Sequence, residues 1–208
     1  DAEVEYLDYT SDAIYVSFPI KKTNLKNLIN CEIIIWTTTP WTVPANKALA
    51  YNKGLKYLIL ELKNDGDFKG RKIVLAKDLL ESIVKNCKIE NYKVLKEFSG
   101  KEFLGTICYH PFYKIGYDYE IPMLEAGFVT TEQGSGIVHC APSHGPDDFN
   151  LCLKHGIKSL DTIDDDGRYT KHIKKFEGIH IFKADQIVIE NLKECKKLLA
   201  NGKLNHSY

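Results

Sequence analysis

The chain has 208 residues, of which 44% are hydrophobic and 27% charged, as is typical of a soluble globular domain. Lysine and arginine together number 28, as do aspartate and glutamate, so the formal net charge is zero. This balance excludes the basic face of an autonomous, high-affinity nucleic-acid binder, but not a domain that handles only the end of a nucleic acid. No stretch reaches the roughly 20 apolar residues that span a bilayer, and no signal peptide opens the chain, so we expect a cytoplasmic domain without membrane contact.

The six cysteines are dispersed and form no CxxC pair. We therefore expect reduced thiols that mostly fill the core, rather than a zinc site or a disulfide framework. The chain begins without methionine and ends without a terminal signal, which favours a fragment of a longer protein.

The first half of the chain is rich in predicted strands. Alternation predicts a strand over Tyr15–Pro19, and the apolar, β-branched run Cys31–Trp36 predicts a buried one. The hydroxyl-rich segment 37–44 holds two prolines, which exclude a regular helix and predict a loop. Further predicted elements are strands at 57–62 and 72–75 around an Asn-Asp-Gly turn, a helix at 76–85 and a strand at 92–98.

The second half mixes strands and helices. A short strand over Gly136–His139 precedes an Ala-Pro loop, and Gly145-Pro146-Asp147-Asp148 opens a helix that continues to about Lys154. After an acidic turn at 164–167, we predict a helix over 183–199 and a short strand over 203–206. Short strands without regular βαβ alternation favour a mixed α/β class, a β-barrel-like domain with flanking helices.

The threonine-rich loop presents hydroxyls and an amide. Thr37, Thr38 and Thr39 follow the predicted buried strand, and Trp41 and Asn46 come shortly after them. Hydroxyls both donate and accept hydrogen bonds, so they suit a ribose, a water molecule or an ester oxygen. A turn whose threonines only satisfy one another remains an alternative.

The second segment brings a histidine and two carboxylates close together in sequence. The strand delivers His139, and Asp147 and Asp148 lie in the first turn of the helix that follows. The helix dipole and backbone N–H groups hold such a carboxylate ionised, which makes it a receptor for a ligand ammonium. A buried core histidine and acids that merely favour the helix start remain open alternatives.

Together, the two segments resemble the editing insertion of isoleucyl-tRNA synthetases. The threonine-rich loop, the Gly-Ser/Thr-Gly strand and the Ala-Pro loop are shared by the isoleucyl, valyl and leucyl editing domains. The valyl and leucyl domains usually have arginine at the position of Thr39, an acid at that of Trp41, and lysine or methionine at that of His139. This chain follows the isoleucyl pattern at all three positions, and residues 144–148 resemble bacterial-type members.

The resemblance implies a single editing domain over 1–208, with 1–20 and 200–208 as ribbons leading to an absent catalytic core. The HIGH and KMSKS signatures are absent, so no synthetase activity is expected, and ATP and magnesium belong to that core. The implied function is post-transfer editing: hydrolysis of valyl-tRNA(Ile), sparing isoleucyl-tRNA(Ile), without a cofactor or metal in this domain. Implied partners are the valine-carrying 3′ end of tRNA(Ile) and the rest of the synthetase chain, with the domain itself monomeric.

The resemblance also implies roles for individual residues. Asp148 is expected to bind the valyl ammonium, and His139 to border the side-chain pocket and exclude a larger side chain. Trp41 and Asn46 are expected to shape the pocket and hold the terminal adenosine. The expected catalytic residues are Thr38, Thr39, His139 and Asp148, and the expected substrate-binding residues are Thr37, Trp41, Asn46, Gly136, Ile137, Val138 and Asp147.

Three other functions fit parts of the sequence. A metal hydrolase would use His139, His144 and Asp148, although no HExxH motif supports it. A cysteine hydrolase would pair Cys140 with His139, but neighbours on a strand point to opposite faces. The third alternative is a non-catalytic module that binds the end of a tRNA.

Overall fold

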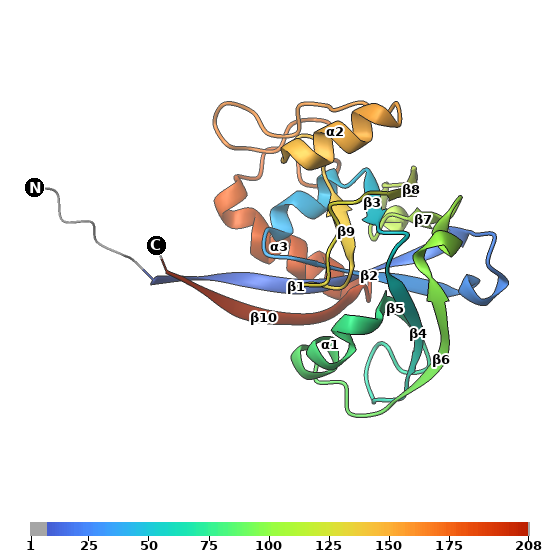
Figure 1. Ribbon diagram of the computed structural model, residues 1–208. Helices are drawn as coiled ribbons and strands as arrows, with labels where there is room; N and C mark the ends of the chain where they lie inside the picture. Colours follow the sequence, from blue (N-terminus) through green and yellow to red (C-terminus); the bar gives the residue numbers. More distant parts are fainter. Residues whose placement is uncertain (1–7, 208) are drawn as a thin grey trace, which may run out of the picture.

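A computed structural model describes residues 8–207, and it confirms the predicted mixed α/β class (Figure 1). The strands are β1 (Asp8–Lys22), β2 (Cys31–Thr37), β3 (Ala48–Tyr51), β4 (Lys56–Leu62), β5 (Lys72–Ala76), β6 (Tyr92–Ser99), β7 (Ile107–Tyr109), β8 (Glu120–Glu125), β9 (Ile137–Cys140) and β10 (Leu198–Ser207). The α-helices are α1 (Leu80–Asn86), α2 (Pro146–Lys154) and α3 (Ile181–Glu194). Short 3₁₀ helices occupy Lys26–Leu28, Pro40–Ala45, Lys77–Leu79, Gly100–Phe103 and Tyr113–Ile115.

Strand β1 organises the sheet, because three partners pair with successive parts of it. It pairs antiparallel with β10 first, then with β2, and at its far end with β7. The strand order is β6-β4-β5-β2-β1-β7-β8-β3-β9, with β10 beside β1. The sheet is thus barrel-like but open, since its path ends at β6 on one side and at β9 on the other.

Ser135, just before β9, bonds to strands β2 and β5, which are distant from β9 in this strand order. The Ser135 hydroxyl donates to the Ile34 carbonyl at 2.6 Å, and the Ala76 amide donates to the Ser135 carbonyl at 2.8 Å. These bonds hold β9 next to β2, where the threonine-rich loop begins.

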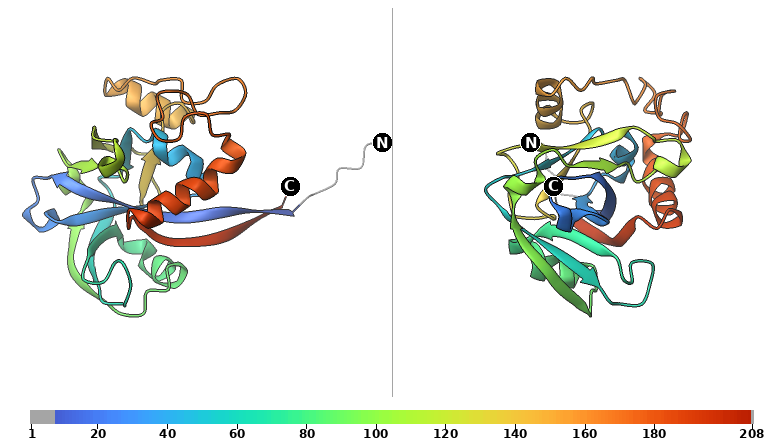
Figure 2. Two further views of the ribbon diagram at one scale, coloured as in Figure 1. Left: turned by 180° about the vertical axis from the view of Figure 1, so that it is seen from behind. Right: turned by 90° about the vertical axis from the view of Figure 1, so that its right-hand side faces the viewer.

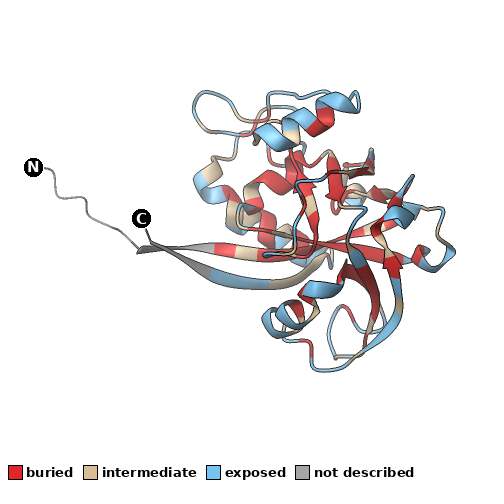
Figure 3. Cartoon of the chain, in the orientation of Figure 1, coloured by how far each residue is buried: buried red, intermediate tan, exposed pale blue. Residues whose placement is uncertain are grey.

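The core lies between these curved layers, and β2 runs through it, as its apolar sequence predicts (Figure 3). Ile33, Ile34 and Ile35 are fully buried. Helix α3 packs behind the sheet and against the 3₁₀ helix at Pro40–Ala45 (Figure 2). The threonine-rich loop is therefore anchored at one end by a buried strand.

The last predicted helix was too long. Helix α3 ends at Glu194, and the residues predicted as its final turn open strand β10 from Leu198. Lys196 adopts a left-handed φ of 59°, which ends the helix, and the Ser17 amide bonds the Lys197 carbonyl at 2.9 Å. Pairing with β1 thus overrides the apolar helical pattern.

Other element boundaries differ less. The predicted helix at 76–85 begins only at Leu80, after β5 and a 3₁₀ turn, and the predicted proline loop is a 3₁₀ helix over Pro40–Ala45. Strands β3, β7 and β8, which are three to six residues long, were not predicted. Strand β8 contains Pro122, at the point where its partner changes from β7 to β3.

The two expected connecting ribbons, 1–20 and 200–208, are described only in part. Residues 1–7 and 208 lie outside the described residues. Over the rest, β1 and β10 form a two-stranded antiparallel extension that leaves the body of the molecule (Figure 1). That they lead to a catalytic core stays a prediction.

Candidate functional site

The threonine-rich loop forms its own hydrogen-bond network where β2 ends. Thr39 donates its amide to the Thr37 hydroxyl at 3.1 Å, and the Thr42 hydroxyl donates to the Thr39 carbonyl at 2.8 Å. The hydroxyls of Thr37 and Thr39 lie 3.2 Å apart. Thr38 is half-buried and Thr39 exposed, so the loop is fixed internally while it presents side chains outward.

Glycine is required where the chain enters β9. Gly136 has a φ of 82°, and a Cβ there would lie 2.3 Å from the Ala76 Cβ. The Tyr57 hydroxyl donates to the Gly136 carbonyl at 2.7 Å. Only a residue without a side chain lets β9 approach this closely, and the approach brings His139 toward the threonines.

The His139 ring is held at both nitrogens. Its Nε2 lies 2.9 Å from the Thr42 hydroxyl, and its Nδ1 lies 2.6 Å from Nδ2 of Asn46. The same Asn46 nitrogen also donates to the Ala48 carbonyl at 3.0 Å, which fixes the orientation of the amide. Nδ1 therefore accepts, and Nε2 carries the proton and donates to Thr42. Burial lowers the pKa of His139 to about 4, so the ring is neutral.

Asp148 lies in the first turn of α2, as predicted. Its Oδ2 accepts the Ala141 amide at 3.0 Å, which ties the helix start to the end of β9. Burial raises the pKa of its carboxyl, an effect that the backbone hydrogen bond to Ala141 opposes. The helix dipole and the backbone amides favour the ionised form, as the sequence predicts, whereas desolvation of this partly buried carboxylate disfavours it.

The two segments meet at one pocket of about 230 Å³. Its lining residues are Trp36, Thr37, Thr38, Thr39, Thr42, Val138, His139, Ala141, His144 and Asp148. A half-buried carboxylate lies on one wall, hydroxyls on another and a neutral imidazole beside them. The pocket can therefore receive a small cationic group next to a polar group that is to be hydrolysed.

Neither rival catalytic arrangement is formed. Cys140 is fully buried, and burial raises the pKa of its thiol well above its ordinary value, so it is no thiolate nucleophile. Across residues 8–207, no three histidine, cysteine or acidic side chains are grouped so that they could hold a metal ion. Within the same range, no helix is long and apolar enough to cross a membrane.

The chain is similar to known proteins in both sequence and structure. No family model matches it. An isoleucine–tRNA ligase from Pelagibacter ubique is 69% identical over 208 residues, which are 100% of this chain and 23% of that protein. A leucyl-tRNA synthetase CP1 domain, GlLeuRS-CP1, matches the structure with a TM-score of 0.68 at 16% identity, covering 91% of this chain and 98% of that one. The editing domain of the cytosolic leucyl-tRNA synthetase of P. knowlesi matches with a TM-score of 0.66 at 11% identity, covering 95% and 96%.

This chain corresponds to the editing-domain segment of isoleucine–tRNA ligases. The resemblance inferred from the sequence motifs is thereby confirmed. The chain spans about a quarter (23%) of the length of the Pelagibacter relative.

Within the editing-domain segment, the structure gathers some predicted site residues and leaves others outside the pocket. Thr37, Thr38, Thr39, Val138, His139 and Asp148 line it together. Five predicted substrate contacts do not line it: Trp41, Asn46, Gly136, Ile137 and Asp147.

The five predicted residues that do not line the pocket lie elsewhere in the structure. Asn46 is completely buried behind His139, where it holds the ring. Trp41 lies in a neighbouring depression with its ring edge-on to His144, at 4.8 Å between centroids. Gly136 supports the backbone of β9, Ile137 belongs to the core, and Asp147 is exposed.

The pocket is also lined by residues that were not predicted as part of this site: Trp36, Thr42, Ala141 and His144. Thr42 belongs to the same hydroxyl-rich run, so its chemistry was visible, but its contact with His139, 97 positions away, was not.

Proposed function

We propose that this editing-domain segment hydrolyses the ester bond of valyl-tRNA(Ile) and spares isoleucyl-tRNA(Ile). The observation that supports this function best is the convergence of Thr38 and Thr39 with His139 and Asp148 on one pocket. These groups come from segments about 100 positions apart in the sequence, and together they match the parts of an α-amino ester: an ammonium, a side chain and a carbonyl.

A second pocket is needed because valine and isoleucine differ by one methylene. A hydrophobic pocket discriminates such a difference by only about 1–3 kcal/mol, a limit for which isoleucyl-tRNA synthetase is itself the best-known example and which we therefore take as a premise. A smaller pocket that admits valine and rejects isoleucine adds the missing discrimination.

Each lining group has a role in this proposal. Asp148 binds the α-ammonium, because a cation offsets the desolvation that raises the pKa of this carboxyl. Thr38 and Thr39 orient the ester and the attacking water. His139 acts as a rigid wall, since both ring nitrogens are engaged and the neutral ring cannot readily accept a proton.

The proposed reaction needs only water as co-reactant. Its oxygen attacks the ester carbonyl, the bond from that carbon to the ribose oxygen breaks, and the ribose hydroxyl leaves with a proton. Valine and free tRNA are the products. The aminoacyl ester is already reactive, so positioning and polar stabilisation of the developing oxyanion suffice without a metal or cofactor in this domain. The proposed partners are the 3′ end of tRNA(Ile) and the rest of the synthetase chain, and the domain itself acts as a monomer.

Two neighbouring aspartates allow a matched test. Asp148→Ala should abolish deacylation of valyl-tRNA(Ile), whereas Asp147→Ala removes the same charge from the same helical turn but outside the pocket and should keep it. Deacylation is measured with radiolabelled valine, in this segment and in a full-length synthetase that contains it. Equal activity of the two variants would contradict the ammonium role. A folded, tRNA-binding wild type without hydrolysis would favour a non-catalytic RNA-end binding module.

A further inference from the structure

The 3₁₀ helix that follows Thr39 carries the residues that contact both histidines of the pocket. The Thr42 hydroxyl lies 2.9 Å from Nε2 of His139, and the Trp41 ring lies edge-on to that of His144, at 4.8 Å between centroids. Thr39, the residue before this helix, lines the pocket itself. The placement of one short helix therefore positions much of the pocket wall.

The start of this helix is not capped in the usual way. The first N–H groups of a helix have no partner within it, and a threonine just before the helix normally accepts one of them with its side-chain oxygen. Thr39 occupies that position, yet its side chain makes no capping hydrogen bond. Its hydroxyl lies instead 3.2 Å from that of Thr37 and 3.3 Å from that of Thr42. The hydroxyl of Thr39 thus belongs to the threonine network of the pocket.

The capping bond comes from Asp185, 144 positions further along the chain. Its Oδ1 accepts the Trp41 amide at 3.0 Å. Trp41 is the second residue of the 3₁₀ helix, after Pro40, which has no N–H, so its amide is the first that needs an acceptor. The following amide, that of Thr42, bonds the Thr39 carbonyl at 2.9 Å, as in any 3₁₀ turn.

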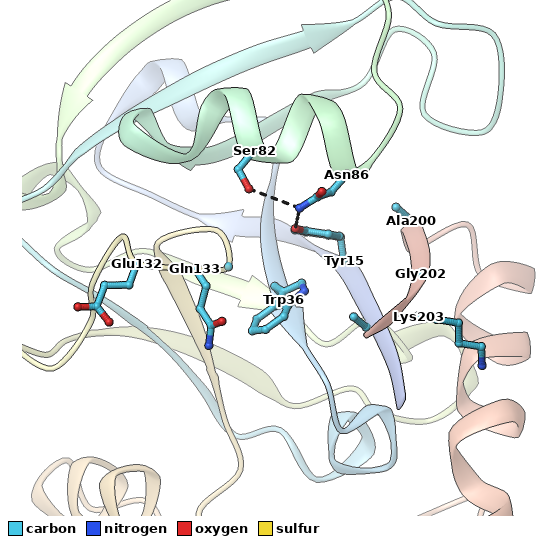
Figure 4. Close-up of a pocket in the computed structure, with 11 residues that line it drawn as sticks. Tyr15, Trp36, Ser82, Asn86, Glu132, Gln133, Ala200, Gly202 and Lys203 are labelled. Atoms are coloured by element: carbon cyan, nitrogen blue, oxygen red, sulfur yellow. Dashed lines mark hydrogen bonds between the residues drawn. The ribbon is translucent and has the colours of Figure 1, made fainter. Parts of the chain in front are cut away.

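Helix α3 presents Asp185 from a fixed position. Ala184, just before it, is completely buried in the core, and Gln186, just after it, donates to Oδ2 of Asp12 at 2.7 Å. Lys203 of β10, which lies beside α3 in the close-up of Figure 4, contacts the other oxygen of Asp12 at 2.7 Å. The capping carboxylate is therefore attached to a rigid element and not to a loop, as precise positioning of another group requires.

We infer that Asp185 is a positioning residue for the deacylation: it caps the 3₁₀ helix, so that the Thr39 hydroxyl stays in the pocket. The inference rests on the proposed function, in which Thr39 orients the ester and the attacking water. Without an acceptor on α3, the Trp41 amide would take the Thr39 hydroxyl as its cap, as at ordinary helix starts, and draw it away from the substrate. Asp185 does not line the pocket, so it acts only through this loop.

Two substitutions at this position make the first test. Asp185→Leu removes the acceptor at similar size, and Asp185→Asn keeps an Oδ1 that accepts the amide. In Asp185→Leu, kcat for valyl-tRNA(Ile) should fall at least about fivefold with KM little changed, which is the factor that a lost cap represents. Asp185→Asn should retain most of kcat. Glu190→Ala, which removes an exposed carboxylate from the same helix, is the matched control and should keep the wild-type rate.

Hydrogen exchange of the Trp41 amide tests the cap without any hydrolysis. In Asp185→Leu, this amide should exchange at least about fivefold faster than in the wild type, because a hydroxyl is a weaker acceptor than a carboxylate. Unchanged exchange would overturn the inference. A wild type that leaves valyl-tRNA(Ile) intact would contradict the proposed function, whereas faster exchange in Asp185→Leu would still support the cap.

A double-mutant cycle separates positioning from a merely structural role. Thr39→Val removes the hydroxyl that Asp185 is inferred to keep in place, so Asp185→Leu should lower kcat next to Thr39 but not further in the Thr39→Val background. Rates are measured in single turnover with the enzyme in excess, in this segment and in a full-length synthetase that contains it. Loss of stability is expected in both backgrounds, so only the rates distinguish the two roles. An equal loss of kcat in both backgrounds, or an unchanged kcat in Asp185→Leu alone, would overturn the inference.

Discussion

At the scale of one residue, burial of the Asp148 carboxylate destabilises the folded protein. Burial raises the pKa of its carboxyl, so the folded chain binds this proton more tightly than the unfolded chain does. Stability therefore falls as pH rises from the ordinary aspartate pKa through the raised one, and above it the whole penalty is present. A ligand ammonium would offset this penalty, because it restores favourable interactions to the desolvated carboxylate.

The Asp148→Asn variant separates these two effects. It keeps an oxygen that accepts the Ala141 amide but carries no charge. We expect it to melt at a higher temperature than the wild type at pH 7, with a smaller difference below the ordinary aspartate pKa. Deacylation should fall by about 100-fold or more, as when one partner of a buried charge pair is lost. Calorimetry and deacylation rates measure both, and a lower melting temperature at pH 7 would contradict the pKa argument.

Thr42 is the residue through which the orientation of His139 can be tested. It accepts the Nε2 proton of His139 and donates to the Thr39 carbonyl, so it connects the wall to the threonine loop. Thr42→Val keeps the shape but leaves a buried ring N–H without an acceptor, which should cost about 1–3 kcal/mol of stability.

We also expect Thr42→Val to lower the ratio of kcat/KM for valyl-tRNA(Ile) over isoleucyl-tRNA(Ile), because the ring can then turn. Thr42→Ser keeps the hydroxyl and should retain both stability and selectivity. Loss of stability in Thr42→Val with unchanged selectivity would show that the Thr42–His139 hydrogen bond has a structural role only.

At the scale of elements, the site depends on how closely β9 approaches β5. Gly136→Ala should be strongly destabilising, because the new Cβ would lie 2.3 Å from that of Ala76, in addition to the cost of a left-handed φ of 82°. The conformation alone costs about 1–2 kcal/mol, and overpacking adds about 1–3 kcal/mol.

Gly178→Ala is the matched control, because Gly178 has a φ of 83° and open space around it. It should show the conformational cost alone. Adding Ala76→Gly to Gly136→Ala should recover part of the stability in chemical denaturation, since the clashing methyl is gone. Equal effects of the two glycine substitutions would contradict the close approach.

The elements also show what the sequence can and cannot predict. Long patterned runs such as β2 and β6, and the helix start at Pro146, were predicted because local signals determine them. The end of α3 was not, because β10 is a strand only through its pairing with β1. The hydrogen bonds that hold the His139 ring likewise come from Asn46 and Thr42, which lie 93 and 97 positions away in the sequence. No local pattern reveals such contacts.

At the scale of the whole molecule, two buried neutral histidines link stability to pH. Burial lowers the pKa of His139 to about 4 and that of His110 to about 3, from 6.5. The His110 Nε2 donates to the Val43 carbonyl at 3.1 Å, and its Nδ1 accepts the Phe112 amide at 3.0 Å, so this ring anchors the 3₁₀ helix next to the site. The unfolded chain therefore binds more protons than the folded chain between pH 6.5 and these lowered values.

Stability should consequently be full above pH 6.5 and be lost as pH falls toward 4, with each histidine contributing about 1.4 kcal/mol per pH unit well inside this window. Urea denaturation at several pH values measures the slope. His110→Gln should reduce the slope of unfolding free energy against pH by the contribution of one histidine. This holds even if the variant is less stable at pH 7. An unchanged slope in that variant would contradict a neutral buried His110.

We propose above all that the pocket formed by the threonine-rich loop, β9 and α2 is a selective deacylase site. The most direct measurement is the rate at which the wild-type protein releases valine from valyl-tRNA(Ile) and isoleucine from isoleucyl-tRNA(Ile) under the same conditions. We predict rapid release of valine and little release of isoleucine. Equal release of both amino acids, or release of neither by a folded protein that binds the tRNA, would contradict the account.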